Sequence, residues 1–131
     1  MRLLIDTHIA LWAITDDPSL PKRAREWIAD PSNEIFVSAA TVWEISIKHA
    51  LGPNCRGAIL VSGTTALARF TAAGYLQLGV TSAHAAAVDG LTPHHADPFD
   101  RLLIAQSQVE QLWLVTHDSV LAAYGETVHV V

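Results

Sequence analysis

The sequence predicts an α/β fold in which a central parallel sheet is flanked by helices on both faces. Short apolar runs typical of buried strands alternate with longer segments whose apolar residues have helical spacing. The chain has 131 residues, and half of them are hydrophobic. That is enough to bury the core of one domain. We therefore expect a single three-layer domain over residues 1–131.

In the N-terminal half, each of two apolar runs leads into helical segments. Proline or glycine, with polar neighbours, interrupts the pattern where most of these helices end. Thr7 is the expected cap of the first helix. The expected elements are a strand over Leu3–Ile5, helices over His8–Ile14 and Ser19–Ile28, a strand over Glu34–Ser38 and a helix over Ala40–Leu51.

The C-terminal half continues the alternation, and no element is predicted between Gly52 and Gly63. Asp97 is the expected N-cap of a long helix because Pro98 would occupy the first helical position. The expected elements are a helix over Thr64–Ala73, a strand over Leu76–Leu78, helices over Ser82–Val88 and Asp97–Gln111, a strand over Leu112–Thr116, a short helix over Ser119–Ala123 and a strand over Val128–Val131.

Charge and cysteine content exclude some classes of protein. The net charge is −5, which argues against a protein that holds nucleic acid by electrostatic attraction alone. It does not argue against a nuclease, because a metal ion in an acidic pocket reverses the local field. Cys55 is the single cysteine, so an intrachain disulfide and a cysteine-rich zinc site are excluded.

No apolar run is long enough to cross a bilayer. Asp6 also interrupts the apolar start that a signal peptide would need. We therefore expect a cytoplasmic protein without membrane contact.

Acidic residues follow the ends of the predicted strands. Asp6 ends the first strand, Asp118 follows the strand that closes at Thr116, and Glu44 lies about one turn into the helix after a strand. The carboxyl ends of parallel strands meet at one edge of a sheet, where ligands bind. Asp100 joins this group if its helix starts at the same edge. The sequence therefore predicts one site formed by four carboxylates.

Each of these acids also has an ordinary structural explanation. Asp97 could be only a helix cap, Asp100 could complement the helix dipole, and Asp118 could cap the short helix after it. Glu44 and Asp6 are harder to explain in this way, because they follow apolar residues and a buried carboxylate is rarely unpaired.

Clustering of the carboxylates would raise their pKa values by mutual repulsion. The eight basic residues are too scattered along the chain to relieve it. Mg²⁺ or Mn²⁺ would relieve it, because both ions favour oxygen ligands. Such a site suits phosphoryl chemistry, in which metal activates water and stabilises charge on the phosphate.

Four segments resemble the acidic motifs of PIN domains in VapC-type toxins of toxin–antitoxin pairs. They are Leu4–Trp12 (LIDTHIALW), Ser38–Ile45 (SAATVWEI), His95–Ala105 (HADPFDRLLIA) and Leu114–Asp118 (LVTHD). They span nearly the whole chain in the family's order, and together they are specific. The resemblance implies a PIN-like fold and a metal-dependent endoribonuclease that cuts RNA. It also implies inhibition by a small cognate antitoxin, and often a homodimer.

The resemblance assigns the acidic roles to Asp6, Glu44, Asp100 and Asp118. Asp6 and Asp100 are the expected direct metal ligands, with Glu44 and Asp118 as further candidates. Four residues are secondary candidates: Thr7 and Thr116, which could position a ligand or water, Asp97, and Arg101, which could contact phosphate or pair with a carboxylate. The histidines beside the motifs (His8, His95 and His117) lack the spacing of a zinc site and are interpreted as residues that support the metal ligands or lie on the surface. The four tryptophans are interpreted as core or interface residues.

Two other functions remain open from the sequence. One is a catalytically inactive PIN-like module that only binds a partner, although all four acids are present. The other is a phosphoacceptor receiver domain, which has a similar length and an acidic pocket at its strand ends. A receiver would need a second acid beside Asp6 and a lysine after a late strand, and the sequence has neither.

Overall fold

A computed structural model of the protein describes all residues from 1 to 131, and at its centre is a five-stranded sheet. Every neighbouring pair of strands is parallel, and the order is β3-β2-β1-β4-β5. The strands are β1 (Arg2–Ile5), β2 (Glu34–Ser38), β3 (Leu76–Leu78), β4 (Trp113–Thr116) and β5 (Val128–Val130). The central strand is β1, which explains why the run Leu3–Ile5 is apolar without alternation.

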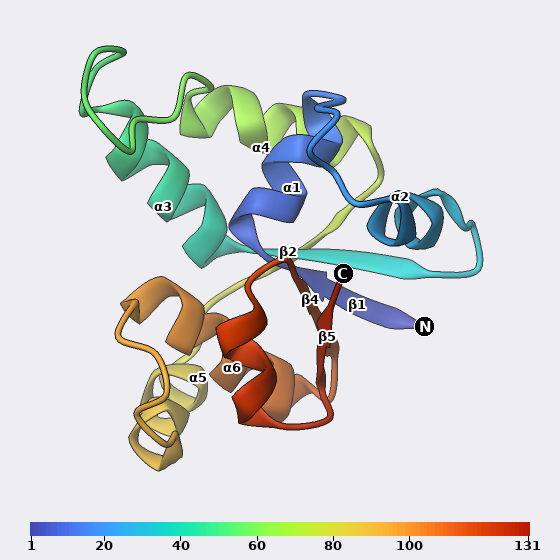
Figure 1. The fold of residues 1–131 in the computed structure, drawn as a ribbon, viewed down its shortest axis with the longest axis vertical. Helices are drawn as coiled ribbons and strands as arrows, with labels where there is room; N and C mark the ends of the chain where they lie inside the picture. The colour runs from blue at the N-terminus through green and yellow to red at the C-terminus, as the bar shows by residue number, and fades with distance from the viewer.

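Helices cover both faces of the sheet (Figure 1), which confirms the expected three-layer α/β fold. The helices α1 to α4 lie on one face, and α5 and α6 lie on the other. Their bounds are α1 (Thr7–Ile14), α2 (Lys22–Ala29), α3 (Ala39–His49), α4 (Gly63–Ala72), α5 (Ser82–Ala87) and α6 (Pro98–Glu110), with 3₁₀ turns η1 (Val88–Gly90) and η2 (Ser119–Tyr124). No helix has the length and apolar character that crossing a membrane requires.

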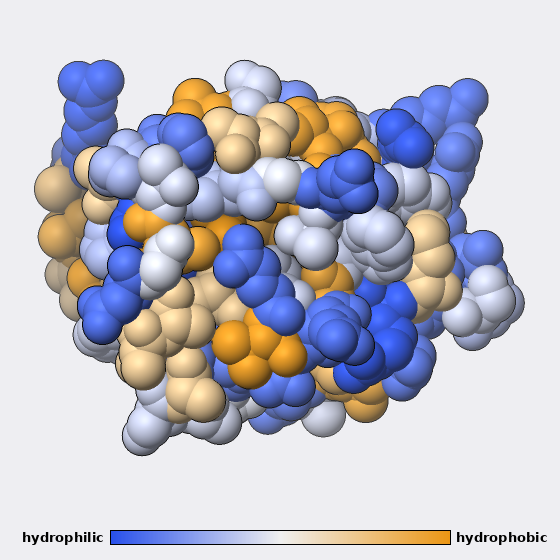
Figure 2. Space-filling model, turned by 90° about the horizontal axis from the view of Figure 1, so that it is seen from below, coloured by the Kyte–Doolittle hydropathy of each residue, from blue (hydrophilic) through white to orange (hydrophobic).

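The core has two halves, one on each face of the sheet. Leu3 and Ile5 of β1 pack in the half under α1 to α4, together with Phe70 of α4. Leu4 packs in the other half, with Leu103 and Ile104 of α6. Seen from the side of α5 and α6, apolar groups reach the surface only at separated places between hydrophilic ones (Figure 2). The alternation along β1 therefore anchors both helical layers to one strand.

The structure corrects several of the expected element boundaries. The second helix begins at Lys22 and not at Ser19, because Pro21 disfavours helical backbone at the residue before it. The residues ahead of it instead form a turn, in which the Leu20 amide donates to the carbonyl oxygen of Asp17. The short helix after β4 is a 3₁₀ turn that extends to Tyr124. The helix expected from Ser82 to Val88 ends at Ala87 and continues as the 3₁₀ turn η1.

The helix α4 begins at Gly63, within the segment for which the sequence predicted nothing. A Cβ atom there would lie 1.8 Å from Oγ and 3.1 Å from Cβ of Ser46 on α3. The missing side chain therefore lets the start of α4 approach α3 closely. This contact holds α3 in place over the sheet edge where Glu44 lies.

Candidate active site

A cavity of about 210 Å³ opens at the carboxyl end of β1, between the starts of α1, α3 and α6. It lies where parallel α/β sheets bind their ligands. The ten residues that line it are Asp6, Thr7, His8, Trp12, Glu44, Lys48, Asp97, Asp100, His117 and Asp118. The structure thus brings together the four acids that the sequence singled out, and it adds Asp97 to them.

Asp6 is fixed at the junction of β1 and α1 and is almost fully buried. Its Oδ1 accepts a hydrogen bond from the Ile9 amide at 2.9 Å, so Asp6 caps α1. The expectation that Thr7 caps this helix was wrong, because the helix starts one residue earlier. Oδ2 of Asp6 accepts a hydrogen bond of 2.5 Å from the Thr116 hydroxyl. Burial raises the pKa of Asp6, and these two hydrogen bonds offset part of that rise.

Thr116 orients two acids at once, which is a more specific role than positioning water. Its buried hydroxyl donates to Asp6 and accepts a hydrogen bond of 3.0 Å from the Asp118 amide. Asp118 in turn caps η2, because its Oδ1 accepts from the Val120 amide. The end of β4 is therefore locked to the end of β1 through one side chain.

Glu44 lies on α3 with only 4% of its surface exposed. Its Oε1 accepts a hydrogen bond of 2.6 Å from the Thr7 hydroxyl, and its Oε2 lies 2.6 Å from Nζ of Lys48. Glu44 and Lys48 lie one helical turn apart on α3, at the spacing that favours such a pair. Burial lowers the pKa of Lys48, but the hydrogen bond and charge of Glu44 outweigh it and raise that pKa overall. One carboxylate is thus already compensated within the chain.

Asp100 lies in the first turn of α6, where Asp97 forms the N-cap. Oδ1 of Asp97 accepts from the Phe99 amide at 2.8 Å and from the Asp100 amide at 3.2 Å, so the expected cap is confirmed. Burial, followed by the charges of Asp97 and Asp6, raises the pKa of Asp100 to about 7. The negative charge around Asp100 is therefore not balanced by the protein itself.

His95 contacts two of the acids, which fits the expectation that it supports the site or lies on the surface. Its Nε2 lies 3.1 Å from Oδ2 of Asp118 and 3.4 Å from Oδ2 of Asp100. Its Nδ1 accepts a hydrogen bond from the Asp97 amide at 3.0 Å. A neutral ring therefore carries its proton on Nε2 and donates it toward the acids. In the sequence, only the position of His95 two residues before the cap Asp97 indicates that it could lie near the acids. Where its ring lies depends on the path of the loop.

Arg101 fastens the loop that carries His95 and forms no ion pair with a carboxylate. Its guanidinium lies within 3.5 Å of the carbonyl oxygens of Val88, Thr92 and His95, and it donates to the Tyr124 hydroxyl at 3.3 Å. That hydroxyl also accepts a hydrogen bond from the His95 amide. The pairing with a carboxylate that the sequence left open is not formed.

A hard divalent cation fits this donor set. Five carboxylates line one small cavity, and Lys48 is the only lysine or arginine in its wall. Oxygen-rich sites of this kind are the ones that Mg²⁺ and Mn²⁺ occupy in proteins. Ligand atoms of His95, Asp100 and Asp118 also lie within 4.8 Å of one another. The residues that face the cavity from β1 and α6, Asp6 and Asp100, are suited to be ligands.

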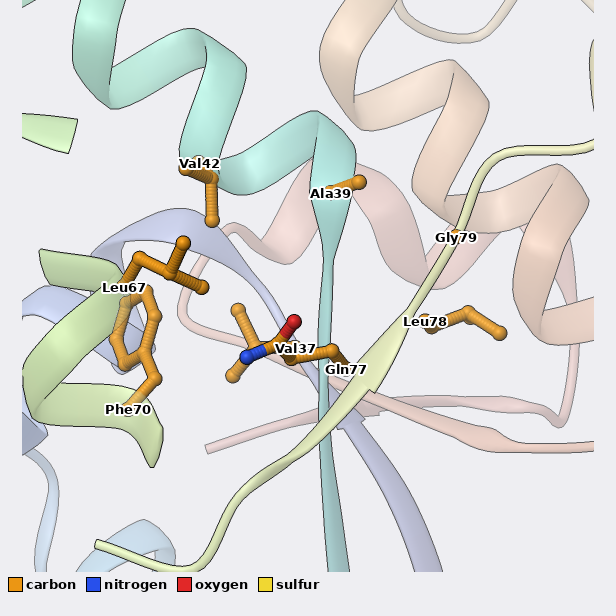
Figure 3. Close-up of a pocket in the computed structure, with 8 residues that line it drawn as sticks. All are labelled: Val37, Ala39, Val42, Leu67, Phe70, Gln77, Leu78 and Gly79. Atoms are coloured by element: carbon orange, nitrogen blue, oxygen red, sulfur yellow. The ribbon is translucent and has the colours of Figure 1, made fainter. Parts of the chain in front are cut away.

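A second cavity, of about 220 Å³, lies between β2, β3, α3 and α4 (Figure 3). Leu67 and Phe70 of α4 face Val37 of β2 across it. Gln77 is the only polar side chain in its wall, and none of its lining residues is titratable. This cavity offers no group for acid–base or metal chemistry, so the acidic cavity is the candidate active site.

Comparisons with known proteins agree on the fold. Among curated proteins, none matches the chain. A chain in the crystal structure of VapBC2 from Rickettsia felis, bound to a DNA fragment from its promoter, is 15% identical with a TM-score of 0.70, and the match covers 99% of this chain and 97% of that one. A chain in a toxin–antitoxin complex from Klebsiella pneumoniae is 17% identical with a TM-score of 0.62, and the match covers 98% of this chain and 96% of that one. A chain in FitAcB from Neisseria gonorrhoeae is 19% identical with a TM-score of 0.61, and the match covers 96% of this chain and 95% of that one.

The match to a family model is more specific than these structural likenesses. The PIN domain model matches residues 3–126, which include all four acidic motifs and four of the five strands apart from Arg2 of β1, whereas β5 lies just beyond the matched residues. The protein therefore belongs to the PIN domain family.

Proposed function

We propose that the protein is a metal-dependent endoribonuclease of the VapC toxin type, which hydrolyses phosphodiester bonds of RNA in the acidic cavity. The observation that carries this proposal is the convergence of Asp6, Glu44, Asp100 and Asp118. They come from four separate parts of the chain and line one cavity at the carboxyl end of the sheet of a PIN domain. The proposal treats residues 1–131 as one such domain.

Asp6 and Asp100 would hold Mg²⁺ or Mn²⁺, with Glu44 and Asp118 as further ligands. When bound, the ion lowers the pKa of water and stabilises charge on the phosphate oxygens. The raised pKa values of Asp6 and Asp100 support this assignment, because they show that the chain alone leaves the carboxylates poorly compensated.

The chain's other residues hold the acids in place for this chemistry. Thr116 orients Asp6, while Thr7 and Lys48 together orient Glu44. Nε2 of His95 lies 3.4 Å from Asp100 and 3.1 Å from Asp118, so its proton can stabilise either carboxylate. Fixing the ligands by packing and hydrogen bonds in this way is what a precise metal site requires.

The partners proposed for the protein are RNA, a small cognate antitoxin and a second copy of the chain. The similar structure from Klebsiella pneumoniae is a toxin–antitoxin complex, and the similar VapBC2 structure is bound to a fragment of its promoter DNA. An antitoxin that brings a basic side chain into the cavity would compete with metal for the carboxylates through charge-assisted hydrogen bonds. Inhibition by such a partner should weaken as metal is titrated into the complex.

The competing functions are less well supported. A receiver domain has the strand order 2-1-3-4-5, whereas this sheet has the order β3-β2-β1-β4-β5. An inactive binding module would have no need of five carboxylates in one cavity, where their repulsion lowers stability.

The test is cleavage of total RNA by the purified protein with Mg²⁺ or Mn²⁺, and with chelator. We expect defined fragments with metal and none with chelator. Asp6→Asn and Asp100→Asn should each lower the rate of RNA cleavage at least about a hundred-fold. Circular dichroism should show that the fold of both variants is unchanged. Glu126→Gln, outside the cavity and exposed, is the matched control and should cleave normally. Metal-independent cleavage, or equal cleavage by either variant at saturating metal, would overturn the assignment.

A further inference from the structure

Three aromatic rings form part of the wall of the acidic cavity. His8 and Trp12 come from α1, and His117 follows β4. The ring centroid of Trp12 lies 5.7 Å from that of His8 and 5.6 Å from that of His117, which it meets edge-on. These rings are the only aromatic groups in the wall. The catalytic carboxylates therefore have a continuous ring surface beside them.

This ring surface is held in position by the rest of the protein. Nδ1 of His117 lies 2.8 Å from the carbonyl oxygen of Val131 and must donate to it, because a carbonyl oxygen can only accept. Trp12 is partly buried against the core under α1 to α4, one helical turn after His8. A ligand that contacts the rings would not have to order them first, which favours binding.

Charge in the cavity excludes the usual way of holding RNA. Proteins that bind nucleic acid through phosphates use several lysines or arginines. Here Lys48 is the only one in the wall, and Glu44 binds it at 2.6 Å. The other seven of the chain's eight basic residues do not line the cavity. Lysine and arginine side chains of the wall therefore supply little affinity for phosphates, and contacts to the bases would add to the affinity that a bound metal contributes.

We propose that Trp12, with His8 and His117 beside it, forms a subsite that stacks an unpaired nucleobase next to the scissile phosphate of RNA. The inference rests on the proposed function for its substrate. Aromatic rings stack on any base, because each base has a π-face, but the base must be free of its own helix. The subsite therefore selects single-stranded RNA and discriminates little between base sequences.

Nuclear magnetic resonance of the ¹⁵N-labelled protein in chelator tests this without cleavage. The four tryptophans give four indole N–H signals, and Trp12→Phe identifies that of Trp12. Titration with an adenosine RNA hexamer should shift the Trp12 signal and leave that of Trp113 in place. An abasic ribose-phosphate hexamer has the same charge and no bases, so it should shift neither. Equal shifts of the Trp12 signal with both hexamers, or no shift with either, would overturn the proposal.

Binding constants from the same titration give a second test. Trp12→Leu should weaken binding of the RNA hexamer about ten-fold or more, whereas Trp12→Phe should retain most of it. Trp113→Leu is the matched control, because Trp113 also meets a histidine edge-on but lies outside the cavity. Raising salt from 50 to 200 mM should weaken binding only several-fold, far less than the roughly thousand-fold loss of a protein with six phosphate contacts.

The outcomes separate this inference from the proposed function. If the protein cleaves RNA with metal but Trp12→Leu binds the hexamer normally, the subsite is wrong and the nuclease stands. If the Trp12 signal responds to bases but no RNA is cleaved with metal, base stacking stands and the nuclease fails. Loss of antitoxin binding in Trp12→Leu, with RNA affinity unchanged, would assign the rings to a protein interface and overturn the inference.

Discussion

Asp100 has a pKa of about 7 because it is buried beside other acids. An aspartate in an unfolded chain has a pKa near its usual value of about 3.9. Between these two values the folded protein binds a proton that the unfolded chain releases, so the contribution of Asp100 to stability falls as pH rises from about 4 to 7. Above pH 7 the full cost of an ionised Asp100 is present in the metal-free protein.

Replacing Asp100 by asparagine should remove this cost. In chelator at pH 8, we expect Asp100→Asn to be more stable than the parent by an amount on the order of 2 kcal/mol. Below about pH 4 the difference should nearly vanish, because Asp100 is then protonated in both the folded and the unfolded parent. Saturating Mg²⁺ should reverse the order at pH 8, since metal stabilises only the protein that binds it. Urea unfolding of the parent and of Asp100→Asn under these conditions measures the difference in stability. Equal stabilities of the two proteins at pH 8 in chelator would contradict a site of clustered carboxylates.

Asp97 has two explanations, and substitutions separate them. As an N-cap, its side-chain oxygen accepts from two backbone amides of α6, and asparagine caps as well as aspartate does. We therefore expect Asp97→Asn to retain both stability and RNA cleavage within a few-fold, and Asp97→Ala to lose about 1 kcal/mol of stability. If Asp97→Asn loses as much activity as Asp100→Asn while remaining stable, Asp97 is a metal ligand.

At the scale of secondary structure, buried hydroxyls join elements that are distant in sequence. Thr7 of α1 donates to Glu44 of α3, and Thr116 of β4 donates to Asp6 at the end of β1. On the other face of the sheet, the Ser38 hydroxyl donates to Gln106 of α6 at 2.6 Å. No buried side-chain polar atom is left without a partner. The polar groups at the sheet edge therefore form a satisfied network, as buried polar groups must.

Thr7→Val should test the link between α1 and α3, because valine has the same shape without the hydroxyl. It leaves one oxygen of the buried Glu44 without its donor, so we expect a loss of about 1 to 3 kcal/mol in the free energy of unfolding. Thr7→Ser keeps the hydroxyl and should lose less than half as much. Chemical denaturation of the three proteins in chelator measures it. Equal stability of Thr7→Val and Thr7→Ser would show that the hydrogen bond has no net effect.

The sequence could predict elements where local signals are strong. The apolar run Leu3–Ile5 and the motif of Asp97 with Pro98 predicted a strand and a helix start that the structure confirms. It could not predict that α2 begins after Pro21, or where α4 begins, because neighbouring prolines and the contact of Gly63 with α3 decide these boundaries. Such contacts join residues that are far apart in sequence.

In the candidate site, too, the residues placed by strand order could be predicted, whereas those placed by loop geometry could not. The strand-end rule placed Asp6 and Asp118 at one edge because it depends only on topology. His95 and the carbonyl contacts of Arg101 could not be predicted, since both depend on the path of an irregular loop. Thr7 was expected to cap the first helix, but α1 begins at Thr7 itself and Asp6 is the cap. The Thr7 hydroxyl therefore donates to Glu44 instead.

At the scale of the whole molecule, a parallel sheet collects acids that the sequence spreads over more than a hundred residues. Asp6 and Asp118 follow the ends of the neighbouring strands β1 and β4, which pair in parallel. Helices α3 and α6, one on each face of the sheet, add Glu44 and Asp100. Both helical layers thus contribute carboxylates to one cavity.

The most direct measurement of the central claim is the chemistry of the RNA ends made in ¹⁸O-labelled water with Mg²⁺. Hydrolysis by an activated water places one solvent oxygen on the single terminal phosphate that each cut produces, leaves a hydroxyl on the other end, and needs no 2′-hydroxyl. We therefore predict ¹⁸O in the terminal phosphate by mass spectrometry, continued cleavage of RNA with a 2′-deoxy nucleotide at the cut site, and no product from Asp100→Asn. Ends with 2′,3′-cyclic phosphate, formed equally in chelator, would contradict the account.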